Sequence, residues 1–371
     1  MFESVKTPCY ICYEELLEKN LKILSYVKQK SGAKILLALK GFAFYHLEPL
    51  VSNYLDGCCA SGLWEAKLSN EEFKKETHTY SPAYKEDEID EIVRISEHVV
   101  FNSFIQWQKY KQRALGKTSC GLRINPQISC APVELYNPCG EFSRFGITRE
   151  EFREDLLDGI DGLHFHALCE QGADELESVL KNVEKRFGKY LFKMKWVNFG
   201  GGHHITKDGY DIEKLIKLIC DFSQKYGVQV YLEPGEAIGW RCGILLTSVL
   251  DVVHNDIDIA ILDTSAEAHM PDTLAMPYRS DVRYSGGADE KKYRYRLAGN
   301  SCLSGDIMGD YSFDRPLKVG NKIIFEDQIH YTIVKNTTFN GIKLPSLAVV
   351  KKDGSFKLIK EFGYEEYRNR N

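Results

Sequence analysis

The chain has 371 residues, of which 43% are hydrophobic and 27% are charged, so it can fill a large core and is not disordered in composition. Its 48 Lys and Arg residues are outnumbered by 53 Asp and Glu residues, and a net charge of −5 argues against nucleic acid as a partner. The absence of a long apolar run and of a secretory signal pattern predicts a cytoplasmic protein with no membrane partner. An odd number of cysteines, 11, favours reduced thiols in a reducing compartment.

Short apolar runs alternate with helical patterns over the first two thirds of the chain, which indicates repeated βα units. Amphipathic helices are predicted from Tyr13 to Lys30 and from Asp211 to Tyr226. Eight strands are predicted, and they are Lys34–Leu39, Gly57–Ser61, His78–Ser81, His98–Asn102, Gly121–Asn125, Gly162–Ala167, Trp196–Gly200 and Val228–Leu232. Eight such strands with intervening helices predict an α/β fold, a closed (β/α)8 barrel of the TIM type.

The pattern changes after Gly243 to turn-punctuated runs in which polar and apolar residues alternate, such as NKIIFEDQIHYTIV and SLAVVKKDGSFKLI. Alternation of this kind is typical of β-strands. The sequence therefore predicts a barrel domain over residues 8–243 and a mostly-β C-terminal domain over residues 244–371.

Polar residues follow the predicted strands, at the rim where (β/α)8 enzymes carry their reactive groups. Lys40 comes directly after the first barrel strand and before GFAFYHL. We expect the resulting apolar wall to lower the pKa of this ammonium and to suit it for Schiff-base chemistry. The alternative interpretation is a lysine whose stem lies along the strand end with its charge in solvent.

Three further groups lie on the same predicted rim. Gly200, Gly201 and Gly202 could turn their amides toward a phosphate, or simply form a tight turn. Glu233 could hydrogen-bond a protonated ring nitrogen or pair with a neighbouring strand, and His166 could lie on an aromatic ligand or be structural. A lysine for an imine, glycines for a phosphate, a carboxylate for a pyridinium and a histidine for stacking together indicate pyridoxal 5′-phosphate as cofactor.

Motifs along nearly the whole chain resemble the alanine racemase-like, fold type III family of pyridoxal-phosphate enzymes. The resemblance is to the branch of ornithine, diaminopimelate and carboxynorspermidine decarboxylases. The motifs are LLALKGF, GCCASGLWE, SRFGI, GLHFHALCEQ, VNFGGGHHI, LEPGEAIG and NSCLSGDIMGD. The resemblance implies a barrel that carries the cofactor lysine, a β domain often joined by the N-terminal strand within residues 1–12, and a homodimer with shared active sites.

The resemblance also implies roles for individual residues. It makes Lys40 the Schiff-base lysine, His166 the stacking histidine, Gly200–Gly202 the phosphate cradle and Glu233 the pyridinium partner. Cys302 matches a cysteine that reaches into the neighbouring subunit's site. Either Cys302 or Lys40 would return a proton to the α-carbon after carbon dioxide leaves.

Differences within the branch bear on the substrate. Glu236 stands where ornithine and diaminopimelate decarboxylases have an Arg after the EPG turn, and Phe339 and Asn340 stand near the place of a phosphate-binding tyrosine. The stretch AEAHMPDTLAMPYR is similar to the carboxynorspermidine decarboxylases, which implies decarboxylation of carboxynorspermidine or carboxyspermidine in polyamine biosynthesis. Such substrates carry positive amines, and the candidate acids that would bind them are Glu236, Asp272 and Asp306.

The sequence leaves other functions open. A diaminopimelate or ornithine decarboxylase or an amino-acid racemase would use the same fold and cofactor. A metal-dependent barrel hydrolase would take ligands from His164-Phe165-His166 and His203-His204, but it gives Lys40 and the glycines no role, so we predict no metal. A non-catalytic pyridoxal-phosphate carrier would account for the barrel but not for the β domain.

Overall fold

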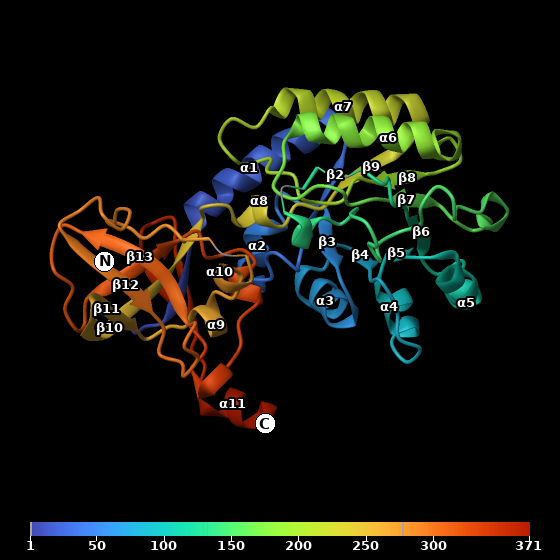
Figure 1. Ribbon diagram of the computed structural model, residues 1–371. Helices are drawn as coiled ribbons and strands as arrows, with labels where there is room; N and C mark the ends of the chain where they lie inside the picture. The colour runs from blue at the N-terminus through green and yellow to red at the C-terminus, as the bar shows by residue number, and fades with distance from the viewer. Residues whose placement is uncertain (1, 129, 132, 277) are drawn as a thin grey trace. The chain divides into compact units, whose positions relative to one another are not determined.

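A computed structural model describes residues 2–128, 130–131, 133–276 and 278–371. The chain forms two compact units, one of residues 18–238 and one of residues 1–17 and 239–371 (Figure 1). The barrel unit thus begins at residue 18 rather than at residue 8, because strand β1 (Cys9–Tyr13) pairs with strands of the other unit. No helix among the described residues is long and apolar enough to cross a membrane.

The unit of residues 18–238 contains the predicted closed barrel of eight parallel strands. The strands are β2 (Lys34–Ala38), β3 (Gly57–Ala60), β4 (Glu76–Tyr80), β5 (His98–Phe101), β6 (Ser119–Arg123), β7 (Gly162–His164), β8 (Trp196–Asn198) and β9 (Gln229–Leu232). Each pairs with the next in chain order, and β9 pairs with β2 to close the barrel. The eight predicted strands are therefore confirmed, with ends that differ by a few residues.

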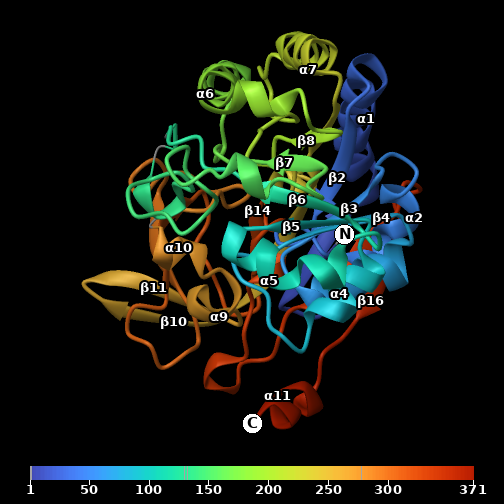
Figure 2. The same cartoon turned by 90° about the vertical axis from the view of Figure 1, so that its right-hand side faces the viewer.

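Helices surround the barrel, and α6 and α7 lie side by side on its outside (Figures 1 and 2). The helices of this part of the chain are α1 (Glu14–Ser31), α2 (Glu48–Val51), α3 (Leu63–Leu68), α4 (Ile89–Ile95), α5 (Phe104–Ala114), α6 (Ala173–Leu191), α7 (Ile212–Tyr226) and α8 (Glu236–Gly239). Helix α7 begins one residue after the predicted start because Asp211 is its cap, and the Asp211 side chain accepts the N–H of Lys214. It ends at Gly227, whose positive φ of 68° suits a glycine.

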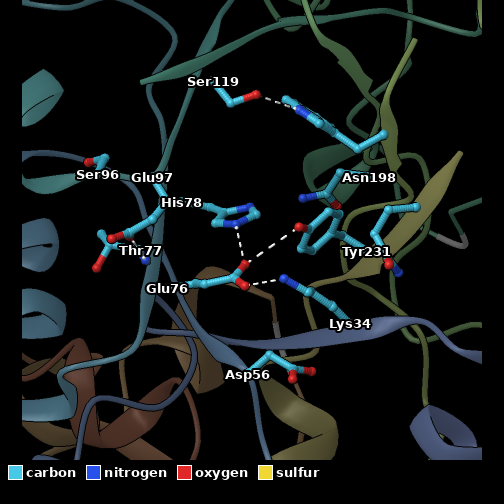
Figure 3. A network of polar contacts seen from close by, with 12 residues as sticks. Lys34, Asp56, Glu76, Thr77, His78, Ser96, Glu97, Ser119, Asn198 and Tyr231 are labelled. Carbon is cyan, nitrogen blue, oxygen red and sulfur yellow. Dashed lines mark hydrogen bonds and ion pairs between the residues drawn. The ribbon is translucent and has the colours of Figure 1, made fainter. Parts of the chain in front are cut away.

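The barrel interior near the start of its strands is filled by a network of polar and aromatic side chains (Figure 3). Glu76 contacts Lys34, the His78 Nε2 atom at 3.3 Å and the Tyr231 hydroxyl at 3.5 Å. Burial alone would raise the pKa of Glu76, but hydrogen bonds and charges from His78 and Lys34 outweigh it and lower the pKa to about 2. This end of a (β/α)8 barrel serves stability.

His98 gives this core a pH dependence. Its ring stacks on His78 with centroids 3.8 Å apart, and burial, reinforced by the charge of His78, lowers the pKa of His98 to about 2. The unfolded chain takes up this proton below pH 6.5 whereas the folded chain does not, so stability falls as the pH falls below that value. We expect His98→Phe to flatten the slope of unfolding free energy against pH by about 1 kcal/mol per pH unit between about pH 5 and 6, measured by chemical denaturation.

The matched control is Val100→Ala, which trims the same core cluster and removes no titrating group. It should lower the free energy of unfolding by a similar amount at each pH. An unchanged slope in His98→Phe would mean that the folded barrel binds the His98 proton as readily as the unfolded chain does.

The other unit is built on an eight-stranded sheet in the order β13-β12-β11-β10-β1-β15-β16, with β14 paired to β10. Its strands after β1 are β10 (Gly243–Asn255), β11 (Ile257–Leu262), β12 (Tyr293–Ala298), β13 (Ile307–Phe313), β14 (Lys322–Glu326), β15 (Ser346–Val350) and β16 (Phe356–Lys360), and its helices are α9 (Ala266–His269), α10 (Asp272–Ala275) and α11 (Tyr364–Arg370). Strand β1 runs antiparallel to β10 and parallel to β15, and buries Cys9 and Ile11 in the core of this unit.

Short turns of other helical types complete the chain. They are η1 (Tyr45–Leu47), the π-type turn η2 (Ser69–Phe73), η3 (Glu134–Tyr136), η4 (Glu154–Leu156), η5 (Thr332–Val334) and η6 (Phe339–Gly341).

Candidate active site

The residues predicted on the barrel rim come from strands that are neighbours in the closed sheet. Strand β7 pairs with β8, β8 with β9, and β9 with β2, so the segments that follow these four strands share one sector of the rim. The Glu233 N–H donates to the Gly200 carbonyl at 2.8 Å, and the Ala38 N–H donates to the Pro234 carbonyl at 2.9 Å. These bonds tie the rim segments to one another at the backbone.

Lys40 lies in the turn after β2 and is exposed. The predicted apolar wall does not surround its ammonium, because β2 ends at Ala38 and the turn carries Lys40 beyond the apolar strand. Burial lowers the pKa of both His164 and His166, and the positive charge of Lys40 lowers it further. The lysine therefore stands within electrostatic range of the histidines of β7 and its loop.

His166 is held as a neutral ring. Its Nδ1 atom accepts the N–H of Gly201 at 2.9 Å, so this nitrogen carries the lone pair. Burial lowers the pKa of His166 well below its ordinary value, and the charges of Lys40 and Arg123 lower it further. Arg123 also donates to the His166 carbonyl at 3.3 Å, which fixes the loop that carries the ring.

Glu233 is held as a carboxylate at the end of β9. Asn198 donates to its Oε1 atom at 2.7 Å, and the Nε2 atom of His164 lies 3.3 Å from its Oε2 atom. Burial would raise the pKa of Glu233, but the charge and hydrogen bond of His164, then His78 and Asn198, lower it to about 2. A group in this state can accept a hydrogen bond from, and place negative charge beside, a cationic ring nitrogen.

The glycine segment after β8 allows close packing. Gly200 and Gly202 have positive φ angles of 71° and 82°, and a Cβ on Gly201 would lie 2.2 Å from the Glu233 carbonyl oxygen. The Gly200 N–H donates to the Asn198 Oδ1 atom at 2.8 Å, and that of Gly201 donates to His166. These two amides are therefore used to hold the glycine loop against Asn198 and His166, and they do not form the expected phosphate cradle.

Glu236, predicted to contact substrate amines, lies at the start of α8. Its Oε1 atom is 3.2 Å from the Nε2 atom of His204. Glu170 lies at the same place, and the three ligand atoms of Glu170, His204 and Glu236 are all within 4.8 Å of one another. The rim therefore carries a small acidic cluster, which we call the Glu170–Glu236 cluster; His164 and His166 are not part of it.

Two acids of the β unit that were predicted to bind substrate amines, Asp306 and Asp272, contact groups of the protein itself. Asp306 is buried, and its carboxylate accepts the N–H groups of Ala266 at 2.6 Å, Glu267 at 3.3 Å and Ser301 at 3.2 Å. It therefore anchors its own loop rather than offering a free acid to an amine. Asp272 forms an ion pair with Lys335, so a substrate amine would have to compete with a cation of the chain.

Two residues of the site were not predicted from the sequence. Asn198 is a buried amide and Glu170 is an exposed carboxylate on the rim. Asn198 could have been found, since it is a polar residue at the end of an otherwise apolar barrel strand, as is Arg123, which the sequence places at the end of the fifth predicted strand. Glu170 follows no strand directly, and only the fold brings it to Glu236.

A (β/α)8 barrel with this lysine, neutral histidine and carboxylate on its rim, and with a sheet unit after it in the chain, is the arrangement expected of a pyridoxal-phosphate enzyme. The family model described as "Pyridoxal-dependent decarboxylase, C-terminal sheet domain" matches residues 10–328. The chain belongs to this family. That membership removes the metal hydrolase from consideration.

Individual relatives are similar over their full length. The chain is 56% identical to a carboxynorspermidine/carboxyspermidine decarboxylase of Campylobacter jejuni, with 100% of both chains covered. It is 44% identical to a carboxyaminopropylagmatine decarboxylase of Synechocystis, over 99% of this chain and 96% of the relative.

Solved structures agree with the fold. A crystal structure of carboxynorspermidine decarboxylase from Campylobacter jejuni, complexed with norspermidine, superposes with a TM-score of 0.94 at 54% identity and covers 99% of this chain and 100% of that one. Diaminopimelate decarboxylase from Helicobacter pylori superposes with a TM-score of 0.85 at 16% identity, covering 100% of this chain and 98% of that one, and shares the fold.

Proposed function

We propose that the protein removes carbon dioxide from carboxynorspermidine or carboxyspermidine and releases norspermidine or spermidine. The observation that carries this proposal is the 56% identity, over the whole of both chains, to a decarboxylase named for these two substrates. The rim chemistry agrees with it, because a decarboxylase of this family needs a lysine, a neutral histidine and a carboxylate close together.

The residues on the rim fit pyridoxal 5′-phosphate. Lys40 is an exposed amine that would hold the aldehyde carbon, and the neutral His166 would lie against the ring. Glu233, ionised and fixed by Asn198 and His164, would pair with the pyridinium nitrogen. When bound, the cofactor supplies an electron sink for the bonding electrons of the departing carboxylate.

Different residues of the chain would serve different steps of the reaction. Glu233 supplies a negative charge that is already in place, because Asn198 donates to its carboxylate and is itself held by the Gly200 N–H. A proton must reach the α-carbon once carbon dioxide has left, and either the Lys40 Nζ atom or the Cys302 thiol of a second subunit delivers it. A shared site of this kind makes the functional protein a homodimer.

Substrate amines would bind at the Glu170–Glu236 cluster. Two carboxylates on one rim attract a protonated amine, and a charge-assisted hydrogen bond is about twice as strong as a neutral one. We expect Glu236→Gln to raise KM for carboxynorspermidine about tenfold while kcat changes less than about threefold, because the contact is made equally before and during the reaction. Steady-state kinetics measures both parameters.

Glu267→Gln is the control, because Glu267 lies in α9 and contributes only its backbone N–H to the contacts described above. It should leave both parameters as they are. A fall in kcat with unchanged KM in Glu236→Gln would mean that Glu236 acts on the reaction rather than on the amine.

A substrate panel tests the function itself. Purified protein supplied with pyridoxal phosphate would be given carboxynorspermidine, carboxyspermidine, carboxyaminopropylagmatine, diaminopimelate and ornithine, with carbon dioxide release and amine products followed by mass spectrometry. We expect the highest kcat/KM for the first two. Preference for any of the other three, or racemisation without release of carbon dioxide, would contradict the proposal.

A further inference from the structure

The loop that carries Cys302 is held from two directions within the β unit. On one side, the buried Asp306 carboxylate accepts the N–H of Ser301 at 3.2 Å. On the other, the Cys302 N–H donates to the Oδ1 atom of Asn340 at 2.6 Å, across 38 positions of sequence. Of the 11 cysteines, all of which lie in the described part of the chain, Cys302 is the exposed one.

Asn340 presents its side-chain oxygen from a stiff turn. It has φ 57° and ψ 15° inside η6, a left-handed conformation that asparagine adopts more easily than most residues. The Gly341 N–H donates to the Thr338 carbonyl at 3.0 Å, and Arg370 of α11 donates to the Thr338 hydroxyl at 3.0 Å. The turn is therefore fixed both internally and by the C-terminal helix.

We infer that Asn340 is a positioning residue for Cys302: its side-chain oxygen fixes the Cys302 backbone and, through it, the direction of the exposed thiol. The inference rests on the proposed function, and on the case in which the Cys302 thiol rather than Lys40 returns the proton to the α-carbon. The backbone amide is one bond from the Cα that carries the thiol side chain, so loss of this anchor leaves residues 302–305 tethered mainly through Asp306. The sequence had left the role of Asn340 open.

Three variants of the full-length protein test the inference. Asn340→Gly removes the acceptor and keeps the left-handed backbone free of strain, while Asn340→Asp retains an oxygen acceptor at the same place. Asp256→Gly is the matched control, because Asp256 has φ 58° in the β10–β11 connection and is exposed, outside the Cys302 loop. It reproduces the gain in backbone freedom without removing a contact to Cys302.

Two readouts are used. The first is the rate of Cys302 alkylation by iodoacetamide, followed by peptide mass mapping across pH so that the thiolate form is compared. The second is the division between kcat and KM for carboxynorspermidine in the holoenzyme. For Asn340→Gly we expect alkylation to accelerate about fivefold and kcat to fall about tenfold with KM within about twofold, because a misdirected group impairs the reaction more than binding. Asn340→Asp should restore both values to within about threefold of the wild type.

Unchanged alkylation and kcat in Asn340→Gly would overturn the inference, as would equal changes in Asp256→Gly. A folded Asn340→Asp as impaired as Asn340→Gly would also overturn it, because the acceptor would then not be what matters. If the wild-type protein decarboxylates nothing, the proposed function fails, but the alkylation rates still show whether Asn340 holds the Cys302 loop.

Discussion

We expect Lys40→Ala to lower kcat/KM for carboxynorspermidine by on the order of 10⁴-fold, the largest effect of any single substitution in this chain. Lys40 is the amine that follows β2, and β2 pairs with β9, the strand that Glu233 follows. Borohydride reduction of the wild-type holoenzyme followed by peptide mapping should place the pyridoxyl group on Lys40. The variant should carry none.

Lys40→Arg and Lys22→Ala are the controls. Arginine keeps the positive charge but cannot form the covalent bond, so Lys40→Arg should be as inactive as Lys40→Ala. Lys22 is exposed on α1, where it pairs with Glu18, and its removal should leave activity unchanged. A pyridoxyl group found on another lysine would remove Lys40 from this role.

A mixture of variants extends the prediction to the homodimer. If the Cys302 thiol returns the proton, Lys40→Ala and Cys302→Ala subunits should each form inactive dimers, whereas a mixed dimer would contain one site with both groups intact. Random exchange should therefore restore about a quarter of wild-type activity, since half of the dimers are mixed and one of their two sites works. No recovery after subunit exchange would mean that Lys40 and Cys302 do not meet across an interface.

The barrel could be predicted because its strands are short apolar runs flanked by helical patterns, and that alternation depends on local sequence. The eight strands are confirmed for this reason. The domain limits could not be predicted in the same way, because they depend on a distant pairing. Strand β1 pairs with β10 and β15, whose residues lie more than two hundred positions later in the chain. Nothing in the residues CYICY themselves distinguishes that partner from a barrel strand, and only the family resemblance indicated that the N-terminal strand joins the β domain.

The residue types of the site could also be predicted, but their partners could not. Glu233 and His166 were predicted from their place at the end of a strand, whereas the contacts that set their charge states come from Asn198, His164 and Gly201. Asp306 shows the limit most clearly, because a carboxylate in a Gly- and Ser-rich loop suggests a surface acid. Only the folded loop brings three backbone N–H groups to it.

The second large effect concerns Glu233. Glu233→Gln keeps the volume and leaves an oxygen for the Asn198 amide, so it removes the negative charge and the acceptor that faces the His164 Nε2 atom. We expect kcat to fall roughly 10²- to 10³-fold, as for other preorganised charges in buried sites, while the dissociation constant for pyridoxal phosphate rises less than about tenfold. Kinetics and a cofactor titration by absorbance measure the two quantities separately.

The pH dependence distinguishes this role from a proton-transfer role. The pKa of Glu233 is about 2, so its carboxylate stays ionised at neutral pH, and its contribution to stability is present above about pH 4.5 and lost as the pH falls toward 2. Wild type and Glu233→Gln should therefore have kcat profiles of the same shape above about pH 5, separated by a constant factor. If the variant instead lost or shifted one limb of the profile, Glu233 would be exchanging a proton during turnover, and its place as a permanent negative charge beside the ring nitrogen would have to be abandoned.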